Sequence, residues 1–153
     1  MSFVEKILYR LAKNWKSPVA DRIASFGAEP GTEKYELAYA QKQYDRKVTL
    51  GLGFAVSGSD VLEIGCGHGG ISCFMATTGA RSVVGIDINK INLGYAEKFL
   101  SALEERSSRI KLPIEFLEMR ADRLELNEDS FDYVLADNVF EHFDDPEAVM
   151  KEA

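Results

Sequence analysis

The chain has 153 residues, of which 46% are hydrophobic and 28% are charged. These values are typical of a single globular domain and exclude a disordered or collagen-like chain. A net charge of −7 disfavours a nucleic acid or an anionic membrane as partner, because an acidic surface repels phosphate groups. No apolar run approaches the about 20 residues that span a bilayer, and the charged N-terminus does not fit a signal peptide. We therefore expect a cytoplasmic protein, with its two cysteines, Cys66 and Cys73, in the reduced state.

Residues 1–55 are predicted to form an N-terminal helical extension. Apolar residues recur at helical spacing over residues 1–26, and Pro18 interrupts the pattern. Thr32 follows a turn signal and is placed to cap a further helix that runs to about residue 50. Two interpretations stay open. The extension either pads the domain that follows or forms a lid that excludes water from a substrate pocket.

Residues 56–153 form a second unit, in which strands alternate with helices. Apolar segments predict strands at residues 61–64, 81–87, 114–118 and 131–136. Helices are predicted at residues 71–78 and 89–106, the second of them capped by Asn89. This alternation indicates βαβ units, so we expect an α/β fold with a parallel sheet.

The C-terminal end carries one more predicted helix, which begins at Asp145 and Pro146. The chain stops at Ala153, and no later segment is present to cover the apolar strand at residues 131–136. We therefore expect a chain that is incomplete at its C-terminus. The uncovered strand is an edge through which two copies could dimerise.

A glycine-rich turn follows the first strand. Gly65 allows the chain to turn tightly, and Gly67 lets the backbone approach a ligand where a Cβ would collide. Asp87 ends the next strand, where a carboxylate can accept hydrogen bonds from both hydroxyls of a ribose. Glu63 would repel the pyrophosphate of a dinucleotide and attract a cationic amino-acid group. The pattern therefore favours S-adenosylmethionine over NAD.

These motifs resemble the class I S-adenosylmethionine-dependent methyltransferases, and within them the small-molecule branch related to ubiquinone-biosynthesis enzymes. Residues 63–69 match the family's E-x-G-x-G-x-G loop, and residues 84–88 match its second motif. Residues 130–143 resemble its S-F-D-x-V-x-x-x-x-V-x-E-H segment. The resemblance covers residues 56–153 and implies a Rossmann-like parallel sheet with strand order 3-2-1-4. The cofactor-binding residues that we predict are Glu63, Gly65, Cys66, Gly67, Gly69, Asp87, Ile88, Ala121, Asp122 and Asp137.

The third motif departs from the family pattern. The aspartate and alanine that contact adenine in the family fall here on Arg120 and Ala121. Arg120 has no acceptor for the adenine amino group, although it could stack on the ring. Asp122 or Glu118 could supply that acceptor after a small shift of the loop, and Ala121 can still donate its backbone N–H.

His142 is the one candidate for a catalytic side chain. With Glu141 it resembles part of an E-x-x-E-H metal site of some relatives, but Asn138 replaces the first acid. Three interpretations stay open: a structural role, a general base that takes a proton from a phenol or amine acceptor, or a metal ligand. Methyl transfer from a sulfonium depends mainly on in-line positioning, so it does not require a catalytic residue.

Two further side chains lie near the glycine-rich turn. We expect Cys66 to pack in the interior and His68 to be exposed on the loop.

The function expected from these residues is transfer of a methyl group from S-adenosylmethionine to a small-molecule acceptor. One alternative is a truncated or degenerate cofactor-binding module without turnover. The other is an NAD-dependent oxidoreductase, because Gly65, Gly67 and Gly70 also satisfy the dinucleotide fingerprint.

Overall fold

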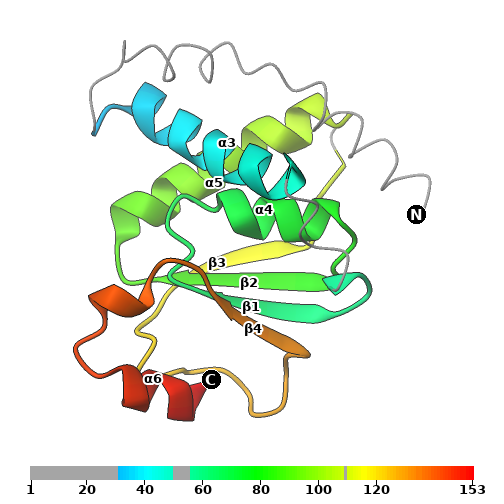
Figure 1. Cartoon of the computed structure of the whole chain (residues 1–153). Coiled ribbons are helices and arrows are strands. Elements are labelled where there is room, and N and C mark those ends of the chain that lie inside the picture. The colour runs from blue at the N-terminus through cyan, green and yellow to red at the C-terminus, as the bar shows by residue number, and fades with distance from the viewer. Residues whose placement is uncertain (1–30, 50–55, 109) are drawn as a thin grey trace.

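The computed structural model describes residues 31–49, 56–108 and 110–153 (Figure 1). The helices expected within residues 1–26 lie outside these ranges. The strands are β1 (Asp60–Ile64), β2 (Ser82–Asp87), β3 (Ile114–Glu118) and β4 (Tyr133–Ala136). The helices are α3 (Glu33–Thr49), α4 (Gly70–Thr77), α5 (Lys90–Arg106) and α6 (Pro146–Glu152), with a 3-10 turn, η2, at Phe140–His142.

The strands form a parallel sheet in the order β3-β2-β1-β4, which confirms the Rossmann-like order expected from the sequence. In its register Ile64 of β1 lies beside Ile86 of β2. The backbone N–H of Cys66 then donates to the carbonyl oxygen of Ile86 at 2.9 Å, just beyond the last residue of β1. The carboxyl ends of β1 and β2 therefore lie side by side, which is where ligands bind in open α/β sheets.

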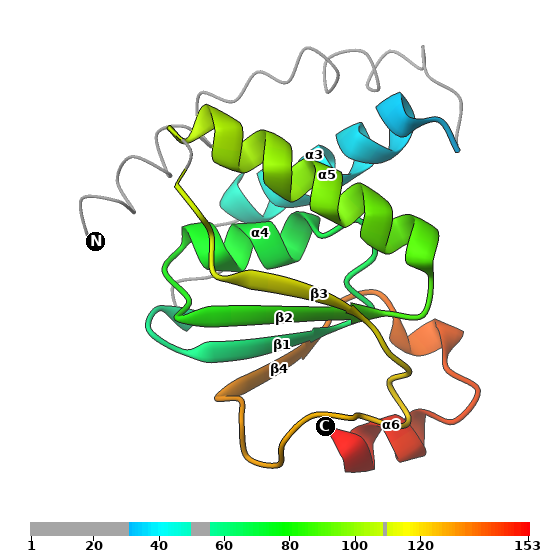
Figure 2. The same ribbon diagram turned by 180° about the vertical axis from the view of Figure 1, so that it is seen from behind.

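The two faces of the sheet are covered by different helices. Figure 1 and the reverse view in Figure 2 show α3, α4 and α5 stacked on one face and α6 on the other. Val61 and Val83 belong to the core on the first face, whereas Leu62, Ile64 and Ile86 pack with Val149 of α6 on the second. Successive strand residues point to opposite faces, so β1 is buried on both faces, by apolar side chains and by Glu63.

Helix α3 starts where the sequence predicts. The Tyr35 N–H donates to the Thr32 hydroxyl oxygen at 3.4 Å, as expected for an N-cap. Towards the other end of α3 the buried Tyr44 hydroxyl lies 2.9 Å from the Thr77 hydroxyl of α4. Burial raises the pKa of Tyr44, so this phenol stays neutral. Helix α3 is therefore docked on α4 through a buried polar pair as well as apolar contacts.

Gly70 at the start of α4 lets α3 approach closely. A Cβ built there would lie 2.3 Å from the backbone oxygen of Ala40 in α3 and 2.9 Å from Gln43 Cβ. We expect Gly70→Ala to destabilise the protein by about 1–3 kcal/mol, since α3 would have to move away. Urea unfolding would measure this loss. Gly94→Ala is the matched control, because a Cβ at Gly94 in α5 meets nothing within 4 Å. We expect Gly94→Ala to stabilise by about 0.5–1 kcal/mol, and an equal loss in both variants would contradict the contact.

The fourth strand starts two residues later than predicted, whereas the starts of α5 and α6 are as predicted. The fourth strand begins at Tyr133 and not at residue 131, because the Asp132 carboxylate turns back to accept the Asp60 N–H at 2.8 Å. Asn89 caps α5 as predicted, accepting the Ile91 N–H at 2.9 Å. Helix α6 has the predicted start, with the Asp145 carboxylate accepting the Ala148 N–H at 3.0 Å.

Across residues 31–49, 56–108 and 110–153, no helix is long and apolar enough to cross a membrane.

Asp60 lies at the amino end of the sheet within a polar network. Hydrogen bonds from Arg81 and then Ser82 lower the pKa of its carboxyl group. The pKa of Asp60 is therefore lower in the folded chain than in the unfolded chain, where it is about 3.9. The stabilisation from ionised Asp60 is complete above the unfolded-state pKa and is lost as the pH falls through the folded-state pKa. We expect Asp60→Asn to unfold at lower urea concentration than wild type at neutral pH, and the gap to close below about pH 3.9. A gap independent of pH would contradict the ionic origin.

Candidate functional site

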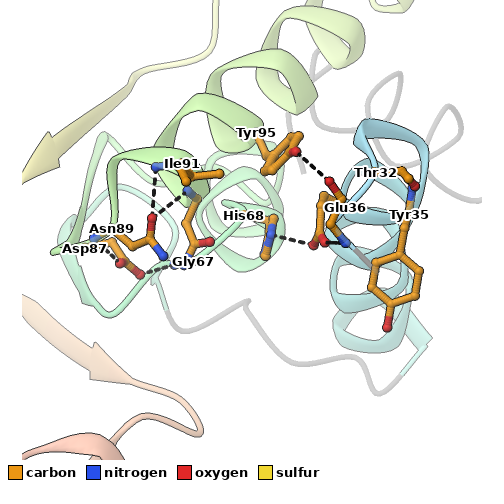
Figure 3. Close-up of polar contacts among 11 residues, drawn as sticks. Thr32, Tyr35, Glu36, Gly67, His68, Asp87, Asn89, Ile91 and Tyr95 are labelled. Atoms are coloured by element: carbon orange, nitrogen blue, oxygen red, sulfur yellow. Dashed lines mark hydrogen bonds and ion pairs between the residues drawn. The ribbon is translucent and has the colours of Figure 1, made fainter. Parts of the chain in front are cut away.

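The glycine-rich loop between β1 and α4 is docked onto the end of β2 through Asp87. One oxygen of the Asp87 carboxylate accepts the Gly67 N–H at 2.9 Å, and the other accepts the Asn89 N–H at 2.8 Å. The two amides hold the carboxylate at the carboxyl end of β2, beside the loop (Figure 3). The glycine-rich loop and the acid at the end of β2, which the sequence motifs place together, are therefore joined by a hydrogen bond in the structure.

A cavity of about 360 Å³ opens beside Asp87 at the carboxyl ends of β2 and β3. The segment after β4 and the start of α6 form its opposite wall, through residues such as Val139, Phe143 and Val149. Arg120 lines this cavity, and so do five of the predicted cofactor-binding residues and the catalytic candidate. They are Gly65, Asp87, Ile88, Ala121, Asp122 and His142. Ile88 is 68% exposed, so an apolar surface is available there for a planar ring.

Five other predicted residues do not line the cavity, although they lie in the loop or at the ends of the strands beside it. They are Glu63, Cys66, Gly67, Gly69 and Asp137. Glu63 is 2% exposed and accepts a short hydrogen bond from the Ser72 hydroxyl of α4. Burial, and then the charge of Glu63, raise the pKa of the Cys66 thiol, which keeps it protonated. Cys66 is buried, as expected.

Arg120 pairs with Asp122 at the rim of the cavity. Its Nε lies 2.8 Å from one Asp122 oxygen and its Nη2 lies 2.5 Å from the other. This bidentate contact lowers the pKa of Asp122. Glu118, the other acid considered for the adenine contact, pairs with Lys90 at 2.9 Å. Asp122 lines the cavity, so of the two acids it is the one in place to accept a hydrogen bond there.

His68 is not exposed, contrary to the expectation from the sequence. Its side chain is 14% exposed, and its Nε2 lies 2.8 Å from the Glu36 carboxylate of α3. Burial lowers the pKa of His68, against the opposing effects of Glu36 and Asp87. This pair could not be predicted from the sequence, because nothing in the local pattern shows that α3 packs over the loop.

Glu141 and His142 lie in η2 and are both exposed, with His142 facing the cavity. In the described part of the chain, no group of three or more His, Cys, Asp or Glu side chains is placed to hold a metal ion.

Together, the strand order, the loop after β1 and the acid at the end of β2 define a Rossmann-like domain of the nucleotide-binding type. A family model described as "Methyltransferase domain" matches residues 62–153, and the chain belongs to this family. The class of protein expected from the sequence motifs is therefore confirmed, and S-adenosylmethionine is the cofactor that this class indicates.

Individual relatives cover the same part of the chain. It is 37% identical over 97 residues to a ubiquinone biosynthesis O-methyltransferase of Paraburkholderia phymatum, which covers 63% of this chain and 38% of that protein. It is 31% identical over 93 residues to a phthiotriol/phenolphthiotriol dimycocerosates methyltransferase of Mycobacterium tuberculosis, covering 58% of this chain and 31% of that one. The chain thus spans less than two fifths of the length of these relatives.

Solved structures show the same fold at lower identity. Magnesium protoporphyrin IX methyltransferase from Synechocystis, determined with bound S-adenosylmethionine, has a TM-score of 0.56 at 18% identity and covers 99% of this chain and 71% of its own. A methyltransferase from Methanococcus maripaludis has a TM-score of 0.58 at 15% identity and covers 99% of this chain and 58% of its own. Both likenesses support the Rossmann-like sheet.

Proposed function

We propose that this chain carries the S-adenosylmethionine site of a methyltransferase that acts on a small-molecule acceptor. The observation that carries the proposal is the Asp87 carboxylate, held by two backbone amides beside the glycine-rich loop and facing a cavity of about 360 Å³. A carboxylate in this position can accept hydrogen bonds from two ribose hydroxyls. Family membership agrees with this assignment.

The predicted cofactor-binding residues, in the cavity and on the glycine-rich loop, divide into roles along such a ligand. Asp87 would hold the ribose, Ile88 would pack on the adenine, and Asp122 and the Ala121 N–H would meet the edge of the ring. The loop near the amino-acid end of the ligand would be shaped by Gly65, Cys66, Gly67 and Gly69. Asp137, which directly follows β4, would lie towards the same end. The buried negative charge of Glu63 below this loop favours a cationic amino group over a pyrophosphate.

When bound, S-adenosylmethionine supplies an activated methyl group. The chain's own contribution is to hold the acceptor in line with that group and to exclude water, which accounts for much of the acceleration in such reactions. His142 faces the cavity and is the candidate to accept the proton that a phenol or amine acceptor loses. The relatives named for ubiquinone and phthiotriol methylation support a small-molecule acceptor.

Calorimetric titration with S-adenosylhomocysteine, with NADH as control, tests the cofactor assignment. Circular dichroism first establishes that the chain is folded. Binding of S-adenosylhomocysteine alone would support the proposal. Selective binding of NADH would instead support the oxidoreductase alternative. A folded chain that binds neither ligand would support a module without turnover.

Three further assignments belong to the same proposal. We place the protein in the cytoplasm, in keeping with its two unpaired, buried cysteines. We divide the chain into an extension, residues 1–55, and a cofactor-binding domain, residues 56–153.

We also propose that β4 pairs with a second copy, since Tyr133 is 47% exposed at the edge of the described sheet. Sedimentation equilibrium of wild type and Tyr133→Lys would test dimerisation, and a wild-type monomer would overturn it.

A further inference from the structure

We propose that Glu36 of α3 is a positioning residue for the cofactor site and acts through His68 on the glycine-rich loop. Docking of α3 and binding of the ligand would then be coupled. This inference rests on the proposed function, because the coupling is measured through the binding of an S-adenosyl compound.

The Glu36 carboxylate is the first contact in this connection. One of its oxygens accepts the Gly31 N–H at 2.6 Å, and the other lies 2.8 Å from His68 Nε2 (Figure 3). The side chains of Glu36 and His68 are only 13% and 14% exposed. A carboxylate so far removed from water needs its hydrogen-bond partners, so loss of either side chain leaves the other poorly satisfied.

The His68 ring is fixed by aromatic side chains from two helices. Tyr39 of α3 meets it edge-on at a centroid distance of 5.4 Å, and Tyr95 of α5 stacks on it at 5.6 Å. The Tyr95 hydroxyl also donates to the Gly31 carbonyl at 3.4 Å. His68 therefore joins α3, α5 and the loop, and a neutral ring with its proton on Nε2 satisfies Glu36.

The connection continues from His68 to the cofactor site. His68 follows Gly67, whose N–H donates to Asp87 at 2.9 Å. Figure 3 shows Glu36, His68, Gly67 and Asp87 in sequence from α3 to the end of β2. A change at Glu36 can therefore alter the position of the Gly67 amide and with it the orientation of the Asp87 carboxylate. Coupling between two sites is reciprocal, so a ligand on Asp87 should also favour the docked α3.

The first test is the affinity of the full chain for S-adenosylhomocysteine, measured by calorimetry. We expect Glu36→Ala to weaken binding about tenfold. Glu36→Gln should restore most of the loss, because the amide can accept from Gly31 and donate to the other tautomer of His68. His68→Ala should weaken binding similarly, and the double variant Glu36→Ala/His68→Ala should be no weaker than either single variant.

Tyr44→Phe is the matched control for a merely structural effect. It removes the hydroxyl contact between α3 and α4 at the other end of α3, away from the loop. We expect Tyr44→Phe to lower the stability of the protein and to leave the affinity within about twofold. Equal weakening by Tyr44→Phe and Glu36→Ala would overturn the proposal, because general loosening of α3 would then suffice.

Hydrogen exchange on the wild-type chain provides a second measurement that does not depend on folding of a variant. S-adenosylhomocysteine should slow exchange of the α3 amides near Glu36, although Glu36 does not line the cavity. Unchanged exchange of these amides, or unchanged affinity in Glu36→Ala, would overturn the coupling. The proposed function would still stand in that case, provided that the wild-type chain binds S-adenosylhomocysteine. Failure of the wild type to bind overturns both.

Discussion

Asp87→Ala is expected to weaken binding of S-adenosylhomocysteine by about 1–3 kcal/mol, roughly five- to 150-fold. Two effects act in the same direction. The ribose hydroxyls would lose a charged acceptor, and the N–H groups of Gly67 and Asn89 would lose the oxygens that hold them at 2.9 and 2.8 Å. Calorimetric titration at fixed pH and salt would measure the change.

Two comparisons separate these effects. Asp87→Asn keeps one oxygen for a backbone amide but removes the charge, so its affinity should fall between those of wild type and Asp87→Ala. Asp60→Ala removes a carboxylate at the opposite, amino end of β1, where it accepts from Arg81 and Ser82. That variant should be less stable but bind normally. Wild-type affinity in Asp87→Ala would remove Asp87 from the site.

Much of the fold could be predicted because its determinants are local. Apolar runs mark the strands, and caps such as Thr32 and Asn89 mark the helix starts, since each depends on neighbours within a few residues. The link between the loop and Asp87 was also predictable, because a parallel β1–β2 pair brings both carboxyl ends together. The strand order was implied only by the family resemblance.

The parts that could not be predicted depend on packing between distant segments. Whether His68 points to solvent or to α3 is decided by where α3 docks, and that depends on close approach at Gly70. Glu63 is similar: its place in the chain predicts a role at the ligand, but its hydrogen bond from Ser72 of α4 could not be read from that pattern. Side-chain direction at such positions follows from tertiary contacts that no local pattern encodes.

Gly67→Ala is expected to weaken binding of S-adenosylhomocysteine at least about tenfold while lowering stability by only about 1–2 kcal/mol. Gly67 has a φ of +53°, and a Cβ built there meets no protein atom within 4 Å. The added methyl group would therefore occupy open space on the loop, where the backbone must approach the ligand. Calorimetry would measure the affinity, and urea unfolding would measure the stability.

Gly58→Ala provides the matched control, because it separates backbone strain from obstruction of the ligand. Gly58 also has a left-handed φ, +77°, and open space around its Cβ, but it lies in the turn before β1, at the opposite end of that strand. Both variants should therefore lose similar stability from the strained backbone. Only Gly67→Ala should lose affinity. Equal affinities in the two variants would mean that the ligand does not approach the loop at Gly67, and the site would then have to lie elsewhere along the cavity.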